Sequence, residues 1–406
     1  MNGAELVKYT FPIIIFIFWI YTSHKEKSKK ISLGCLFFSS IVACSQNFEF
    51  IYRQIHQLIQ ILLCVCFLTN LANKGSLPKA SYILIIFLGF VVASLIAAPF
   101  DQDAKAQLIN IIICAIISCF LLQIVDSTLT FSIFLRYIGS LASISAASGL
   151  MEFFIDQQLR IESTFANPNY CALFLGIGWC SVFSLGKGLS KWIQLSLITS
   201  ALILTGSRAG LLLPIFQILW ILYIQRNFLK TFLYTILSLT IILFILASGL
   251  TRFSATEDTA GSDSERLIFA KIAINMAGDH PITGVGWGRF VTEFANYSSS
   301  VDKIELENGV IDASLQERRV THNDFLRILA ELGWPAMITC FFFIFKSGSY
   351  LLKYKAYTIT ALFPIWAGLV VFSLLHNNLN TALTWFFLLI PFHLRMRAMR
   401  NFYHTQ

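Results

Sequence analysis

The stretch RRVTHNDFLRILAELG, residues 318–333, leads from two arginines and a histidine into an apolar run that continues to residue 345. A helix that crosses a bilayer needs about 20 apolar residues, or about 17 at the short end. The run 324–345 therefore predicts a membrane-spanning helix with His322 at its mouth. Arg327 and Glu331 are four residues apart on that helix, a spacing that predicts an ion pair between them.

The composition of the whole chain predicts an all-α integral membrane protein. Hydrophobic residues make up 56% and charged residues 13% of the chain, whereas a soluble domain has roughly 25% charged residues. The nine cysteines lie in or beside apolar runs, so we interpret them as small hydrophobic residues and not as a disulfide framework. The first apolar run leads into a lysine cluster without a small-residue cleavage site, and we expect no cleaved signal peptide.

Apolar runs along the chain predict about twelve or thirteen membrane-spanning helices. No internal repeat is visible in the sequence. One long polar segment, residues 251–323, separates the tenth candidate span from the eleventh. The thirteen candidates are residues 7–22, 31–46, 55–72, 81–98, 107–123, 128–150, 170–186, 191–206, 209–225, 229–250, 324–345, 356–375 and 381–394.

The distribution of lysine and arginine predicts the orientation of these helices, because short cytoplasmic loops carry more of both than short outer loops do. Sixteen such residues fall in one set of alternate connections and five in the other. The segment 251–323 and the N-terminus are therefore expected outside, and the C-terminus inside. The net charge of +8 follows largely from this bias and requires no nucleic-acid partner. The sixteen are Lys25, Lys27, Lys29, Lys30, Lys74, Lys79, Lys187, Lys191, Arg226, Lys230, Lys346, Lys353, Lys355, Arg395, Arg397 and Arg400, and the five are Lys8, Arg53, Lys105, Arg160 and Arg208.

Polar residues near a bilayer cost free energy and mark substrate paths, and the chain gathers them on the predicted outer side. In LTGSRAGLL, residues 204–212, Arg208 starts a span on the side that arginines avoid. A guanidinium binds phosphate oxygens through two parallel hydrogen bonds, so Arg208 is a candidate anion ligand. In RIESTFANPNYCALF, residues 160–174, the pair Asn167 and Asn169 either starts the next helix, with Asn169 as its cap, or presents amides to a sugar.

The outer segment contains one predicted helix, from Ser262 to Gly278. Ser262 and Glu265 have the spacing of a capping box, and Gly278 ends an apolar face. Such a helix is expected to lie at the outer membrane interface. Arg266 would lie near its first turn, where free amides favour an anion, so we expect Arg266 to help hold a phosphate.

The glycine-rich stretch PITGVGWGRF, residues 281–290, follows that helix. Its spacing does not match a dinucleotide fingerprint. We interpret it as a flexible turn that places Trp287 near the membrane interface. Arg289 at its end is a secondary candidate for contact with an anion.

His322 is the candidate general base of the outer side, because its side chain titrates near neutral pH. Arg319 and Asn323 beside it are candidate substrate contacts. Asp324 is not expected to pair with His322, because residues two apart do not face each other on a helix.

Four motifs in this order, STFANPN, LTGSRAG, SERLIFAKIAINMAGDHPITGVGWGRF and THNDFLRILAELG, resemble the bacterial O-antigen ligase family, which includes related polysaccharide polymerases. The resemblance covers roughly residues 160–335. It implies a multi-span glycosyltransferase of GT-C-like build, whose donor is a glycan on undecaprenyl diphosphate at the outer face of the inner membrane. The ligase passes the glycan to a sugar of lipid A–core, and the polymerase passes it to the next repeat unit. The family's functional arginines and histidine match Arg208, Arg266 and His322.

The chemistry of these residues fits that reaction. A diphosphate that leaves an anomeric carbon gains charge, which preorganised cations stabilise, and Arg208 and Arg266 suit this role. His322 would accept the proton of the acceptor hydroxyl. We expect no metal site and no other cofactor, because the acidic residues between 257 and 265 lack ligand-like spacing. The expected partners are the lipid-linked glycan, lipid A–core or a growing glycan, and membrane lipids.

Alternatives to the ligase remain. A short outer segment and an extra apparent span depart from the family pattern and leave ligase versus polymerase open. A transporter or flippase should instead carry polar residues at mid-membrane in both halves, often with internal repeats. We expect N-terminal helices at 1–159, a ligase-like catalytic region at 160–345 that includes 251–323, and C-terminal helices at 346–406. The active site would face the periplasm.

Overall fold

The computed structural model describes residues 77–125, 128–156, 160–163, 165, 167–225, 256–298, 304–306, 309–311, 321–353 and 361–404, with a few more between 64 and 71. These residues form helices and one short antiparallel hairpin. The elements in chain order are α4 (Ser81–Ala97), α5 (Gln102–Ile124), α6 (Thr128–Asp156), α7 (Pro168–Leu185), α8 (Gly188–Leu204), α9 (Arg208–Gln225), α11 (Thr256–Asp279), α12 (Phe290–Ser298), β1 (Ile304–Leu306), β2 (Gly309–Ile311), α13 (Asp324–Lys353), α14 (Leu362–Ser373) and α15 (Ala382–His404).

Nine of the predicted spans coincide with apolar helices in the described part of the chain. Four of these helices, α5, α6, α7 and α13, are long and apolar enough to cross a membrane, and α4, α8, α9, α14 and α15 are shorter. The predicted spans at 7–22, 31–46 and 229–250 lie outside the described residues, as does most of 55–72. The fold is that of an all-α membrane protein.

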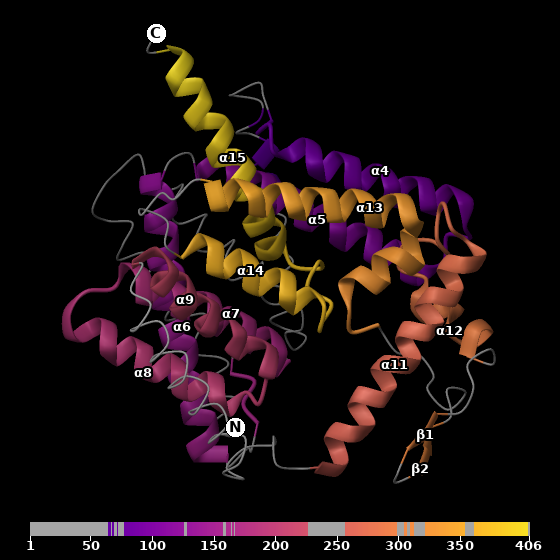
Figure 1. Ribbon diagram of the computed structural model, residues 1–406, viewed down its shortest axis with the longest axis horizontal. Helices are drawn as coiled ribbons and strands as arrows, with labels where there is room; N and C mark the ends of the chain where they lie inside the picture. The colour runs from indigo at the N-terminus through magenta and orange to yellow at the C-terminus, as the bar shows by residue number, and fades with distance from the viewer. Residues whose placement is uncertain are drawn as a thin grey trace.

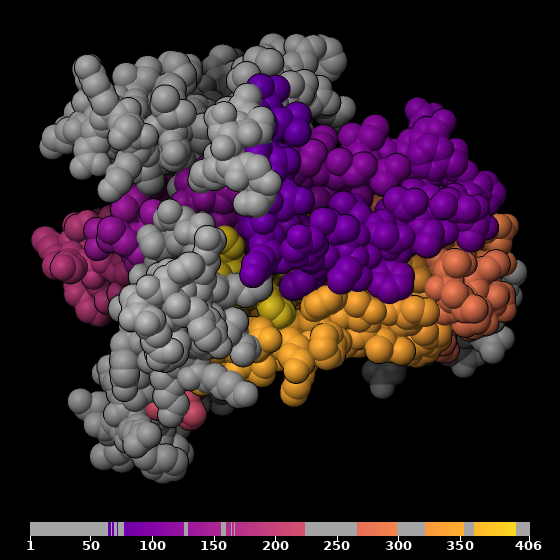
Figure 2. Space-filling model, turned by 90° about the horizontal axis from the view of Figure 1, so that it is seen from above, coloured from indigo at the N-terminus to yellow at the C-terminus, as the bar shows by residue number. Residues whose placement is uncertain are grey.

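The apolar helices pack in two groups that α14 connects (Figure 1). In one group α6 and α9 flank α7, with α8 against α6 and α7, and in the other α13 packs on α4 and α15 while α5 packs on α15. Aromatic residues fill the space where α6 meets α15: the rings of Phe134 and Phe386 are 5.0 Å apart, and both side chains are fully buried. Figure 2 shows α4 and α13 side by side on one face, with residues of 266–298 at one end.

Helix α13 is broken at Gly333, whose φ of 78° and ψ of −178° are not helical. Its 30 residues would span about 45 Å as one helix, more than the bilayer core of about 30 Å. The part after Gly333 reaches about 30 Å alone and is long enough to cross. The predicted span at 324–345 thus coincides with a candidate membrane helix, but that helix is interrupted at Gly333, and Arg327 and Glu331 belong to the short helix before the break.

The loop at 281–286 holds this break in place. Amide groups of Val285 and Gly286 donate to the Ala330 and Glu331 carbonyls at 2.9 and 3.1 Å, which satisfies groups that lose their helical partners. A Cβ on Gly284, whose φ is 65°, would lie 2.2 Å from the carbonyl carbon of Glu331. The backbones meet too closely for any side chain there. The predicted flexible turn is thus a tightly packed one.

The Trp287 side chain is fully buried within the protein and is not an exposed aromatic anchor. Its ring packs edge-on against Phe87 of α4 at 5.8 Å, and the Arg327 guanidinium lies 4.3 Å from its ring centre. The indole is part of the core that joins the 281–290 loop to α4 and α13.

Helix α11 begins at Thr256, six residues before the predicted start at Ser262. The capping-box prediction is therefore wrong, and Arg266 lies in the middle of the helix instead of near its first turn. The apolar face is also directed differently from the prediction: Ile268, Ile272 and Met276 are fully buried against α12 and the short helix of α13. This face packs on protein and is not free to enter a membrane interface.

Candidate functional site

His322 lies in the turn that leads into α13. Its φ is 49°, a left-handed conformation that is uncommon for a residue other than glycine and that concentrates at functional sites. The next residue, Asn323, accepts hydrogen bonds from the backbone N–H groups of Phe325 and Leu326 at 2.9 and 3.0 Å. Asn323 therefore caps the helix, and the cap holds the half-buried His322 at the helix mouth.

Helix α11 brings Arg266 to this turn. The ring of Phe269 lies 6.3 Å from the His322 ring. Arg266 and Phe269 are three residues apart in α11, so both side chains lie on the same face of the helix. The sequence-predicted pair of Arg266 and His322 is thus brought together, although not through the helix start that the sequence suggested.

A second histidine, His376, joins them from the connection between α14 and α15. Its ring is 6.5 Å from that of His322, and the two planes are nearly perpendicular. Burial, together with the positive charges of Arg266, His322 and Arg160, lowers the pKa of His376 to about 3. These four side chains, which we call the basic cluster, come from four separate stretches of sequence. The sequence HNNLN, residues 376–380, gives no indication of these neighbours.

The loop that carries His376 is fixed by its neighbours. Asp324 accepts hydrogen bonds from the backbone N–H groups of Asn378 and Leu379 at 2.8 and 3.1 Å. The Tyr170 hydroxyl donates to the Asn377 carbonyl. These bonds tie the loop to both α13 and α7. They also show Asp324 bound to the loop, in agreement with the expectation that it is not the partner of His322.

Arg160 ties the α8–α9 turn to the start of α7. Its Nε donates to the Thr205 carbonyl at 2.9 Å, and its Nη2 donates to Asn169 Oδ1 at 3.2 Å. Asn167 caps α7, because its side chain accepts from the Asn169 N–H at 2.8 Å. The prediction of Asn169 as the cap is therefore wrong by two residues. Both asparagines have structural contacts, which weakens the case for either as a sugar ligand.

Arg208 is the first residue of α9 and is exposed. Among the described residues it has no hydrogen-bond or ion-pair partner. The hydroxyl of the adjacent Ser207 is buried and has no hydrogen-bond partner among the described residues. A helix start repels a cation and attracts an anion. Arg208, and not Arg266, therefore lies where free helix amides favour an anion.

Arg289 is fully engaged within the protein. Its Nε lies 3.0 Å from Asp101 and its Nη2 lies 2.5 Å from Glu293, while its Nη1 donates to the Val285 carbonyl at 3.2 Å. Burial raises the pKa of Asp101, but the Ala104 N–H and Arg289 outweigh it, so that pKa lies below its usual value. These contacts favour a structural role for Arg289. Arg319 lies outside the described residues.

The predicted ion pair between Arg327 and Glu331 is confirmed, with Nε and Oε2 3.0 Å apart and both side chains buried. Arg327 also donates to Asn380 Oδ1 at 3.0 Å and to Gln107 Oε1 at 3.2 Å. Glu331 accepts in addition from the N–H groups of Gly288 and Phe290, at 2.9 and 3.1 Å. Every charged atom of the pair is thus directed at protein, so we place the pair outside the reacting centre.

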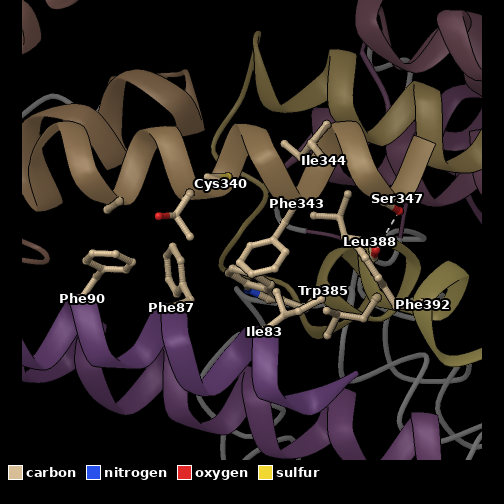
Figure 3. Close-up of a pocket in the computed structure, with 13 residues that line it drawn as sticks. Ile83, Phe87, Phe90, Cys340, Phe343, Ile344, Ser347, Trp385, Leu388 and Phe392 are labelled. Carbon is tan, nitrogen blue, oxygen red and sulfur yellow. Dashed lines mark hydrogen bonds between the residues drawn. The ribbon is translucent and has the colours of Figure 1, made fainter. Parts of the chain in front are cut away.

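An apolar cavity of about 40 Å³ lies between α4, α13 and α15 (Figure 3). Phe87 and Phe90 of α4 point across it towards Cys340 and Phe343 of α13. Its lining contains no charged residue. Such a cavity cannot bind a diphosphate, because nothing in it would replace the hydration of the charges.

The basic cluster suits an oxygen-rich anion with a hydroxyl beside it. Two guanidiniums near an imidazole can bind phosphate oxygens while the imidazole accepts a proton. Among the residues that the structure describes, no three His, Cys, Asp or Glu side chains gather as a metal site requires.

Comparison with known proteins gives one family match. The family model described as O-antigen ligase matches residues 193–341, a stretch that contains Arg208, Arg266 and His322. No curated protein matches the chain. The resemblance seen in the motifs is therefore confirmed over residues 193–341, which match the O-antigen ligase family model, in a chain with helices long and apolar enough to cross a membrane.

Proposed function

We propose that the chain is an O-antigen ligase, which transfers a glycan from undecaprenyl diphosphate to a sugar hydroxyl of lipid A–core. The reaction would take place at the periplasmic face of the bacterial inner membrane, in a GT-C-like fold. The observation that carries the proposal is the meeting of Arg266 with His322 beside Arg160 and His376. Residues that are far apart in sequence and costly near a bilayer converge there, as a site for an anionic substrate requires.

The reaction follows from the roles of these side chains. The bond between the anomeric carbon and the diphosphate oxygen breaks, and the acceptor hydroxyl oxygen forms a bond to that carbon. The hydroxyl proton passes to a ring nitrogen of His322. Undecaprenyl diphosphate leaves with one more negative charge, which Arg266 and Arg208 stabilise. A positioned general base contributes about 10²–10⁴-fold in rate.

Purified protein with undecaprenyl diphosphate-linked glycan and lipid A–core tests the arginines. Arg208→Lys keeps the charge but loses the two-pronged hydrogen bonding of a guanidinium, and Arg266→Ala loses both. We expect both variants to lose most transfer at unchanged protein level. Arg136→Lys is the matched control, because Arg136 is an exposed arginine of α6 outside the site. Full activity of both site variants would show that Arg208 and Arg266 have no role in the transfer. Movement of the donor across the membrane without glycan transfer would indicate a flippase.

The base is tested with two variants of His322. His322→Ala should lose about 10²–10⁴-fold in transfer rate and still bind the donor, because the arginines remain. In the wild type, activity should fall as the pH drops and the base becomes protonated. If His322→Gln restores the rate with an unchanged pH profile, His322 is a structural hydrogen-bonder and the base lies elsewhere.

Deletion of the gene separates ligase from polymerase. A gel of surface lipopolysaccharide that lacks all glycan on its cores, with polymer retained on the lipid carrier, supports the ligase. Cores that carry a single repeat unit would identify the polymerase instead.

The proposed orientation has its own test. A cysteine at exposed Asn296 of α12 should react with a membrane-impermeant thiol reagent added to the periplasm. A cysteine at exposed Lys187, between α7 and α8, should not. The opposite pattern would place every proposed site residue in the wrong compartment.

A further inference from the structure

The ring of His376 is held in place without the use of its nitrogens. Its backbone N–H donates to the Phe372 carbonyl at 2.8 Å, and its ring packs on the Phe372 ring at 4.7 Å. Neither ring nitrogen has a hydrogen-bond partner among the described residues. The loop below it is tied down through Asp324. An imidazole so fixed, with neither ring nitrogen bonded to the described part of the chain, is available to a ligand.

Among the described residues, the charged or titratable groups that act on this ring are basic. Arg266 approaches from α11, His322 from the turn before α13, and Arg160 from the segment before α7. Together with burial they lower the pKa of His376 to about 3, which favours the neutral form of the ring. A general base needs a pKa near the working pH, so His376 is unsuited to that task. A neutral imidazole still offers one N–H donor and one acceptor nitrogen.

On the basis of the proposed function, we propose that His376 contacts the donor substrate and donates one hydrogen bond to an oxygen of its diphosphate. Arg266 and Arg160, whose charges act on this ring, attract the anion to the same place, and the ring lies 6.5 Å from that of His322. The histidines then divide the work: His322 receives the proton of the acceptor, and His376 stabilises the leaving group. The catalytic region extends beyond the expected 160–345 to include residue 376.

Such a bond strengthens as the leaving oxygen gains charge, so it acts on the transition state more than on the bound substrate. Removal of one preorganised donor of this kind costs about 10²–10³-fold in kcat. Free undecaprenyl diphosphate, which carries the fully developed charge, should also bind more weakly without it, by about tenfold or more.

The test compares two replacements of the ring. His376→Phe keeps the stacking on Phe372 but has no N–H, and His376→Gln keeps an N–H donor. We expect His376→Phe to lose about 10²–10³-fold in kcat with a smaller change in KM, and His376→Gln to recover most of that loss. The decline of activity at low pH should persist in His376→Phe, because His322 causes it. His280→Phe is the matched control, since His280 is exposed in the described structure.

Several outcomes would overturn the inference. His376→Phe with a wild-type kcat would remove the contact, and loss of the low-pH decline in that variant would make His376 the base. His376→Gln as inactive as His376→Phe, with both folded by thermal melting, would exclude the donated bond. If the wild type transfers no glycan, the proposed function fails by itself. Thermal stabilisation by undecaprenyl diphosphate then still tests His376: an equal shift in wild type and His376→Phe would refute its contact with the diphosphate.

Discussion

Replacement of Glu331 by glutamine should destabilise the fold strongly, although the two side chains have the same shape. The carboxylate accepts from Arg327 Nε at 3.0 Å and from two backbone N–H groups at 2.9 and 3.1 Å. A glutamine has one acceptor oxygen, so its amide N–H₂ must face a donor. Arg327, which is 5% exposed, would keep its charge without a counter-charge. Breaking a buried pair in this way costs about 3–5 kcal/mol, and we expect that range.

The assay is thermal unfolding in detergent for the wild type, Glu331→Gln, Arg327→Met and the double variant Arg327→Met/Glu331→Met. Both single variants should unfold several degrees lower. The double variant should lose less than the sum of the two single changes, because it leaves no buried charge unpaired. A Glu331→Gln protein that unfolds at the wild-type temperature would refute the reasoning. So would strictly additive losses, since the two side chains would then act independently.

Three further predictions concern stability. Gly284→Ala should cost about 2–5 kcal/mol in thermal unfolding, because it adds left-handed strain and a backbone clash, whereas Gly89→Ala, with open space around it, should be tolerated. The pKa of Asp101 is lowered in the folded protein. Wild type should therefore be more stable than Asp101→Asn at pH 7, and this difference in unfolding free energy should vanish as the pH falls below about 4. A difference that does not change with pH would exclude the ion pair with Arg289 as its cause. The unfolded chain protonates His376 near pH 6.5 and the folded chain only near pH 3, so wild type should lose stability across that range and His376→Gln should lose less, as measured by unfolding at pH 7.5 and pH 4.5.

Much of the helical framework could be predicted because the apolar runs are long and carry a direct physical signal. The ion pair of Arg327 and Glu331 was also predicted, since a spacing of four residues brings the two side chains together on any helix. The break at Gly333 was not, because it depends on the backbone of Pro281 and Ile282, which approach from a different part of the chain. Local sequence contains glycine and proline there but does not say which backbone occupies the space.

The candidate site was predicted in part for the same reason. Arg266 and His322 stand out as charged residues in a hydrophobic chain, so composition alone marks them. The Asn167 and Asn323 side chains also stand out, yet their hydrogen bonds go to their own helices. His376 is adjacent to asparagines in a short connection and has no pattern of its own. Its importance comes from three neighbours, each at least fifty residues away along the chain.

The basic cluster extends beyond the stretch that the family model matches. The family match covers 193–341, yet Arg160 lies before it and His376 after it. A protein that matches the same family model but lacks the flanking segments around 160 and 376 would lack half of the basic cluster. Substrate preference in related chains should be sought in these flanks first, and exchange of the 374–381 loop between two such enzymes is a direct way to transfer it.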